Sequence, residues 1–224
     1  MKSFAAILIL VLILLSAGCT SHPEPAPPDI SEYLTPIDSG NLSRELGPVP
    51  AGMLTPAEEQ DILFMQEEEK LARDVYAALY EKWQIRAFLN IGEAEQTHLD
   101  SMTVLVDRYQ IESRISNERG VFSNETLRFL YDDLVARGST SSEEALRVGA
   151  LIEEIDIVDL QEAMTRTGRQ DILQVYDNLA KGSRNHLRAF VNVMGQQGIS
   201  YTPQVLPQDE YQAIIASSAE RGRA

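Results

Sequence analysis

This sequence has little cysteine and little positive charge. Cys19 is the single cysteine among 224 residues, which excludes a disulfide within the chain and any metal centre held by several of its own thiolates. Only 19 Lys and Arg stand against 34 Asp and Glu, so the formal net charge is -15. Phosphate backbones repel such a chain, and we therefore expect no nucleic acid among its partners.

Segments of alternating polarity, which are typical of β-strands, are also lacking. Apolar residues instead recur at helical spacing. Thr55-Pro56-Ala57-Glu58 combines a capping residue, a proline and a glutamate in the order typical of a helix start. The pattern predicts an all-α fold with four long helices over about 56–83, 90–110, 142–167 and 170–194, and short helices near 124–137 and 211–216.

The connections between the long segments predict how these helices pair. Short loops join the first to the second and the third to the fourth, so each pair is expected to be antiparallel. About thirty residues separate the second from the third, which is enough for a long crossover. We therefore expect a ferritin-like four-helix bundle over residues 53–217, with a tail at 218–224.

The N-terminal residues resemble an export signal. Met1-Lys2-Ser3 is a short positive start, and the apolar run from Phe4 to Leu15 is short for a membrane span. The run ends in Leu15-Ser16-Ala17-Gly18-Cys19, a lipobox-like cleavage site. We expect residues 1–18 to be a lipoprotein signal peptide and Cys19 to carry lipid. The alternative is an uncleaved anchor with a chance cysteine.

Residues 19–52 contain seven prolines, which predicts an extended tether stiffened by polyproline II structure. His22 lies in this segment and is expected to be solvated. Lipid on Cys19 would hold the exported protein at the outer face of the cytoplasmic membrane or in the cell envelope, with the membrane as a partner.

Each long segment carries an apolar stripe with a spacing of three or four residues, which should face the bundle axis. Polar residues interrupt every stripe near its middle. Burying several unpaired carboxylates would cost several kcal/mol each, whereas one or two divalent cations would neutralise and bind them. Carboxylates with imidazole in a bundle core suit iron or manganese. The polar positions are Glu69, Glu95, His98, Glu153, Asp156, Ser183 and His186.

Other interpretations of these residues stay open. Glu67–Glu69 is also consistent with a solvated run of charge, and His186 with an ordinary core histidine. In the third long helix, Leu151, Ile155 and Val158 form a second apolar face that would move Glu153 and Asp156 to the flank. Glu154 is expected to face solvent in either register.

At these positions the chain resembles rubrerythrin and the wider ferritin-like superfamily. The resemblance rests on Glu69 with Ala72-Arg73 and Tyr76, on Glu95-x-x-His98, on Glu153-x-x-Asp156 and on His186. Ser183 departs from the pattern, because the family has a glutamate three residues before this histidine. The stretch from Met53 to Ser217 also resembles the domain-of-unknown-function 2202 family, which is placed among ferritin-like folds.

The resemblance implies a site for two iron ions, with manganese or another divalent metal as alternatives. Its implied ligands are Glu69, Glu95, His98, Glu153, Asp156 and His186, and Tyr76, Tyr176 and Ser183 are expected around them. For the two tyrosines, a role as ordinary core residues stays equally open. Such a site suggests reduction of peroxide or oxygen with an external electron donor, although Ser183 puts a full two-metal site in question. The alternative is a non-enzymatic helical binding module of the cell envelope, with a buried polar network or a single non-redox metal. A second copy of the chain, forming a homodimer, is considered as a further partner.

Overall fold

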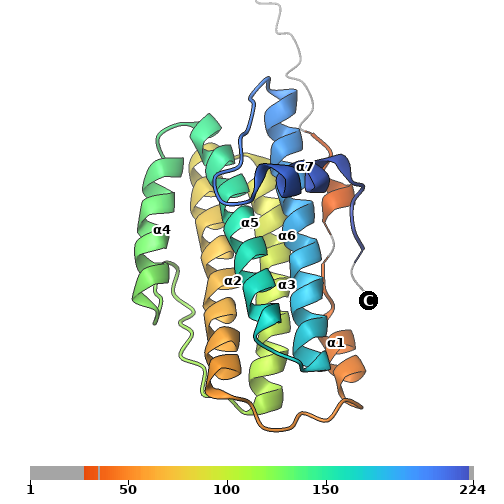
Figure 1. The fold of residues 1–224 in the computed structure, drawn as a ribbon. Helices are drawn as coiled ribbons and strands as arrows, with labels where there is room; N and C mark the ends of the chain where they lie inside the picture. Colours follow the sequence, from red (N-terminus) through yellow and green to blue (C-terminus); the bar gives the residue numbers. More distant parts are fainter. Residues whose placement is uncertain (1–27, 35, 222–224) are drawn as a thin grey trace, which may run out of the picture.

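The computed structural model describes residues 28–34 and 36–221, and in these ranges it is entirely helical (Figure 1). The all-α class expected from the sequence is confirmed. None of the described helices is long and apolar enough to cross a membrane. The elements are η1 (Ser31–Tyr33), α1 (Ser39–Leu46), α2 (Pro56–Trp83), α3 (Arg86–Tyr109), α4 (Glu125–Gly138), α5 (Ser142–Thr165), α6 (Gln170–Gln196) and α7 (Gln208–Ala216).

The four long helices α2, α3, α5 and α6 lie side by side (Figure 1). Helices α2 and α6 run in one direction, and α3 and α5 run in the other. The long connection between α3 and α5 includes α4, which packs against α2 and α5 and returns the chain to the end where α5 begins. This arrangement places the middles of the four long helices at a similar level.

Local capping explains several helix starts. The side chain of Thr55 accepts from the backbone N–H of Glu58, and the Glu58 carboxylate accepts from the N–H of Thr55, so the expected capping box is present at α2. The expected start of the second long helix near Asn90 is wrong, because α3 begins at Arg86 without a side-chain cap. Phe88, in its first turn, is fully buried, so packing determines this start.

The segment expected to be an extended tether contains a helix from residue 39 onward. Asp38 caps α1 by accepting from the N–H of Asn41 at 2.8 Å. Leu42 and Leu46 are four residues apart and are both buried against the long helices, where α1 packs on α3. Residues 28–34 and 36–52 therefore join the folded unit. The signal peptide, Cys19 and His22 lie outside the described residues.

The expectation that Glu154 faces solvent is wrong. This side chain is fully buried, and it accepts hydrogen bonds from the Tyr201 hydroxyl at 2.5 Å and from the backbone N–H groups of Gln204, Val205 and Leu206 at 2.8–3.0 Å. It thereby fixes the segment that leads into α7, which lies across α6 (Figure 1). These donors come from residues about fifty positions away, so the helical periodicity of α5 gave no sign of them.

The apolar stripes of the four long helices, each interrupted by polar residues, face the interior of the molecule. On α5, Glu153 and Asp156 are buried, whereas Ile155 and Val158 of the alternative face are only half-buried. Apolar side chains form two clusters along the long helices. One contains Tyr76, Ile91 and Phe190, and the other contains Ile62, Met65, Met102, Leu160 and Leu179. Along each helix the polar positions fall between these two clusters.

Candidate metal centre

The middle of the molecule holds a buried cluster of three glutamates and two histidines, one or two from each long helix. Helix α2 contributes one glutamate, α3 a glutamate and a histidine one turn apart, α5 a glutamate, and α6 a histidine. None of the five side chains is more than 2% exposed. We call this set the Glu–His row, and in spatial order it consists of Glu69, His98, Glu95, His186 and Glu153.

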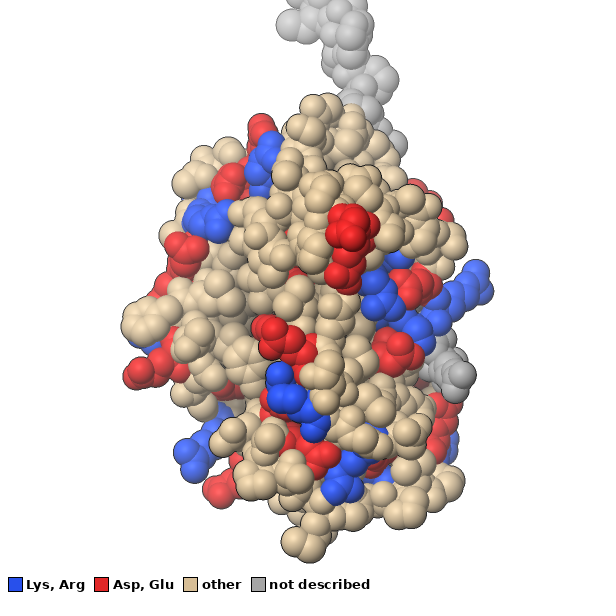
Figure 2. Space-filling model, viewed as in Figure 1, with Lys and Arg blue, Asp and Glu red and all other residues tan. Residues whose placement is uncertain are grey.

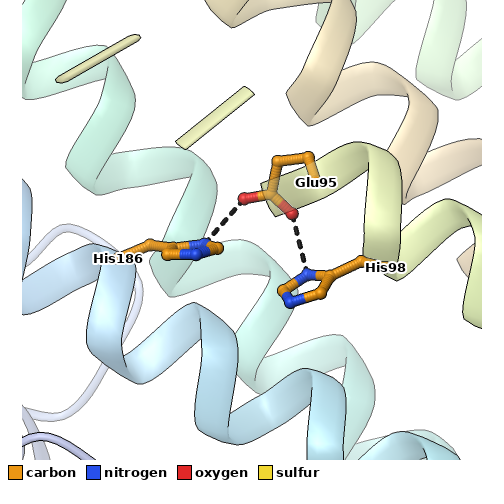
Figure 3. Close-up of side chains that lie close together, drawn as sticks. All are labelled: Glu95, His98 and His186. Atoms are coloured by element: carbon orange, nitrogen blue, oxygen red, sulfur yellow. Dashed lines mark ion pairs between the residues drawn. The ribbon is translucent and has the colours of Figure 1, made fainter. Parts of the chain in front are cut away.

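Glu95 is the centre of the row (Figure 3). Its Oε2 atom lies 2.9 Å from Nδ1 of His98, and its Oε1 atom lies 2.8 Å from Nδ1 of His186. The same nitrogen of each imidazole also faces a second carboxylate. Glu69 Oε2 is 3.3 Å from Nδ1 of His98, and Glu153 Oε2 is 3.6 Å from Nδ1 of His186. Acidic and basic groups therefore alternate across the whole row.

A glycine makes room for one of the imidazoles. The rings of His98 and His186 stack with their centroids 5.3 Å apart and their planes at 22°. A Cβ atom added at Gly182 of α6 would lie 2.4 Å from Nε2 and Cε1 of His98. This separation is far below any normal contact, so His98 occupies its place only because Gly182 has no side chain.

The donor set fits a divalent transition metal. Glu95, His98 and His186 each offer a ligand atom, and the three atoms lie within 4.8 Å of one another. Buried polar atoms nearly always have a hydrogen-bond partner, but Glu69 Oε1, Nε2 of both imidazoles and Asp156 Oδ1 have none. Mixed carboxylate and imidazole donors suit iron, manganese or zinc rather than a soft, thiolate-preferring ion.

The protein's own groups perturb one another strongly. Burial alone would raise the pKa of Glu95, but the flanking His186 and His98 outweigh it and lower this pKa. Burial would lower the pKa of each imidazole, yet their carboxylate neighbours raise both, that of His186 to about 9. Burial raises the pKa of Glu69 to about 7, and burial with the charge of Glu95 raises that of Glu153 to about 8. Near neutral pH the row therefore holds several protons that a bound cation would displace.

Three more residues expected at the site lie beside the row. The Tyr76 hydroxyl donates to Oε1 of Glu153, and Ser183 donates to Oδ2 of Asp156. Asp156 is buried among the carboxylates, and burial followed by the charge of Glu69 raises its pKa well above its usual value. Tyr76, Asp156 and Ser183 are therefore close to the row, as the sequence predicts.

Tyr176 is the expected neighbour that the structure does not bring to the row. Its hydroxyl makes no hydrogen bond, and its pKa is raised by burial and then by the charge of Asp61, a residue near the start of α2. Tyr176 packs in the apolar cluster with Ile62 and Met65, so its role is in the core. An inward position on a helix does not by itself specify the level along the bundle.

Sequence reasoning missed three residues near the site. Glu68 was included in a run of three glutamates, yet it is buried next to Asp156 and Asp159. Asp159 is one turn beyond Asp156 on α5, a spacing that was visible in the sequence. Gly182 lies inside a long helix, where glycine destabilises the helix relative to alanine. A glycine at such a position indicates that another side chain packs closely against the helix backbone there.

Comparison with known proteins places the chain in a family. Residues 58–218 match the family described as "Uncharacterized protein domain (DUF2202)". The chain is 47% identical over 175 residues to "Uncharacterized protein MJ0754" of Methanocaldococcus jannaschii, covering 78% of this chain and 95% of that protein. The crystal structure of hypothetical protein MJ0754 superposes with a TM-score of 0.75 at 47% identity, over 77% of this chain and 99% of that one. The chain belongs to the DUF2202 family.

Proposed function

We propose that the Glu–His row is a divalent-metal centre of the ferritin-like type, which binds iron and reduces peroxide or oxygen. The observation that carries this proposal is the convergence of Glu95, His98 and His186, whose ligand atoms lie within 4.8 Å of one another inside the four long helices. The up-down-down-up course of those helices and the resemblance of their polar positions to rubrerythrin support the ferritin-like assignment.

Each residue of the row has a role that follows from its position. Glu95 lies between the two imidazoles with one oxygen facing each, so it would hold the metal together with both histidines. Glu69 faces His98 and Glu153 faces His186, so each would supply a further carboxylate ligand. Tyr76 donates to Glu153 and so fixes the orientation of that carboxylate.

A pair of ferrous ions bound here would supply the two electrons that reduction of an O–O bond requires. Reduction of hydrogen peroxide to two water molecules also consumes two protons. Asp156 lies beside the row, and burial raises its pKa, so its carboxyl group is suited to hold such a proton. The apolar clusters on either side exclude bulk water from this residue and the row. We propose that an external donor restores the electrons, because the chain has a single cysteine and no cysteine-ligated iron centre of its own.

A single-metal centre without redox activity is the second candidate, and Ser183 favours it. The resemblance places a carboxylate at this position of α6, where a serine instead hydrogen-bonds Asp156. Three ligands from Glu95, His98 and His186 suffice for one ion. A third candidate is a non-enzymatic binding module in which the row is only a buried polar network.

Two measurements separate these candidates. Elemental analysis of protein purified without chelator gives the identity and number of the metal ions. Stopped-flow mixing of the ferrous-loaded protein with hydrogen peroxide then tests the redox reaction, with Glu69→Ala and free ferrous ion in the same buffer as references. Oxidation of the wild type faster than both supports the two-iron centre. If the loaded protein is oxidised no faster than free ferrous ion, the redox function is rejected. If the purified protein contains no metal, the non-enzymatic binding module is the remaining candidate.

We also propose that the protein is an exported lipoprotein, supported by the short positive start, the apolar run and Cys19 in Leu15-Ser16-Ala17-Gly18-Cys19. Lipid on Cys19 would keep it at the outer face of the cytoplasmic membrane or in the cell envelope. Mass spectrometry of the native protein tests this, and an intact Met1 would reject it. The face shown in Figure 2 carries interspersed acidic and basic side chains without a broad basic patch, which supports partners other than nucleic acid.

A further inference from the structure

The described part of the chain begins at one end of the four long helices. Ile30 is buried and belongs to the same apolar cluster as Phe88, in the first turn of α3, and Val193, in the last turn of α6. Helix η1 packs on α6, and the described chain starts beside the last turns of that helix (Figure 1). We call this end, where α2 and α6 finish and α3 and α5 begin, the near end.

Few residues separate the near end from Cys19. Residues 20–27 alone lie between Cys19 and Pro28. An extended chain spans at most about 3.6 Å per residue, so these two residues are within about 30 Å of each other. Helix α6 has 27 residues and is about 40 Å long. If Cys19 carries lipid, the protein therefore cannot stand with the opposite end of its long helices on the membrane.

The turns at the near end contain no charged residue. One joins α2 to α3, one joins α4 to α5, and one follows α6, and they comprise residues 84–85, 139–141 and 197–200. Charged residues next to these turns pair with one another, as in Arg137–Glu144, Arg147–Glu143 and Arg119–Glu81. These pairs leave no net charge beside the turns.

Two exposed cations complete the near end. Lys82 lies in the last turn of α2, and Arg86 is the first residue of α3. Asp29 and Glu32 of the entering segment are exposed and offset these two charges. The near end is therefore close to neutral, although the formal net charge of the whole chain is -15.

The net negative charge of the chain lies on the flanks and at the opposite end. Glu59, Asp107 and Glu112 are exposed at that end, in the first turn of α2, in the last turn of α3 and just after it. Glu93 and Asp133 are exposed along the flanks formed by α3 and α4. A bilayer with anionic headgroups would repel these surfaces more strongly than it repels the near end.

We propose that the near end is the surface that faces the membrane, and that its partner is the headgroup layer of a phospholipid bilayer. This inference rests on the lipid anchor proposed for Cys19 and adds an orientation to it. The short connection to Cys19 keeps the near end close to the bilayer, and the distribution of charge prevents the protein from lying on its side. The long helices then stand away from the membrane, with their acidic end in solvent.

The test compares fluorescent labels at the two ends of α6. Gln197→Cys and Gln170→Cys are matched, because both replace exposed glutamines, and a lipid-modified Cys19 leaves no other thiol to label. The full chain, purified with its lipid, is placed in vesicles of phosphatidylcholine and phosphatidylglycerol that carry an acceptor dye in their headgroups. Energy transfer should place the label at 197 nearer to the bilayer than the label at 170, by roughly 20–40 Å, which is half to all of the length of α6.

Charge reversal at each end tests the electrostatic reason. Arg86→Glu should narrow the difference between the two labels, whereas Arg44→Glu, at an exposed position of α1 near the opposite end, should not. Equal distances from both labels, or a shorter distance from the label at 170, would overturn the orientation and leave the lipid anchor standing. Mass spectrometry of the same sample detects lipid on Cys19, and its absence would reject the anchor and the orientation together.

Discussion

His98 and His186 come from different helices and face the same carboxylate. Their Nδ1 atoms lie 2.9 and 2.8 Å from the two oxygens of Glu95, and their rings stack at 5.3 Å. No other residue of the row contacts both imidazoles, so Glu95 couples α3 to α6. The two histidines therefore belong to one site, and replacing either of them should weaken metal binding at the same position.

Replacing His98 with alanine should reduce metal affinity by at least 100-fold, because it removes one of three converging ligands. His22→Ala is the matched control. It lies in the proline-rich segment and should leave affinity unchanged. Competition titration with a chromophoric chelator measures both. Equal affinity in the two variants would contradict a centre at the row.

Gly182→Ala should displace the His98 ring, since the new Cβ atom would lie 2.4 Å from it. We expect a loss of about 1–3 kcal/mol in unfolding free energy from overpacking, and weaker metal binding. Gly195→Ala, on the same helix, has open space at its Cβ and should be neutral or stabilising. Denaturant unfolding and metal titration of both proteins measure the difference, and a tightly binding Gly182→Ala would disprove the positioning role.

Ser183→Glu should install the carboxylate that the resemblance implies. The new side chain would be buried beside Asp156, so the metal-free protein should lose stability through repulsion between like charges. Added metal should more than offset this loss of stability, and the variant should bind a second ion more tightly than the wild type does. Ser183→Gln has nearly the same size without the charge and should not gain affinity. Thermal melts with chelator and with added metal compare the three proteins.

Glu154→Gln should detach the segment that precedes α7. The amide cannot accept all the hydrogen bonds that Tyr201 and three backbone N–H groups donate to the carboxylate. We expect a loss of about 2–4 kcal/mol in unfolding free energy, with metal affinity unchanged. Glu162→Gln on the same helix is exposed and should change stability by less than about 0.5 kcal/mol. Equal stability of the two variants would show that Glu154 does not anchor the segment.

The metal-free protein should lose stability as pH rises from about 5 to 9. Folding raises the pKa of His186 from 6.5 to about 9, so its stabilising contribution is complete below 6.5 and disappears as pH passes through 9. Folding also raises the pKa of Glu153 from 4.5 to about 8 and that of Glu69 to about 7, which adds losses between 4.5 and 8. Below pH 4.5 the lowered pKa of Glu95 reverses the trend.

Melting temperatures in chelator at pH 5, 7 and 9 measure this dependence. Glu153→Gln is the control, because an amide has no proton to lose and its slope above pH 5 should be shallower. Bound metal should flatten the slope further, since its ligands are then deprotonated at every pH. A constant melting temperature from pH 5 to 9 in chelator would contradict the protonated row.

The sequence by itself determined the helical class, the four long helices and the inward face of each. Apolar residues at helical spacing specify one face, and polar residues at the middle of that face are costly enough to be informative. For this reason the sequence alone places six polar residues on inward faces, and all six are buried: Glu69, Glu95, His98, Glu153, Asp156 and His186. The family followed from the same stretch of residues.

Only the tertiary structure decided which of these groups meet, and in what order. The order Glu69, His98, Glu95, His186, Glu153 depends on how four helices align along their length, which periodicity on a single helix does not encode. The same reason separates Tyr176, which packs with Ile62 and Met65, from the row. The burial of Glu154 and the packing of α1 come from contacts between residues more than forty positions apart, where local propensity carries no information.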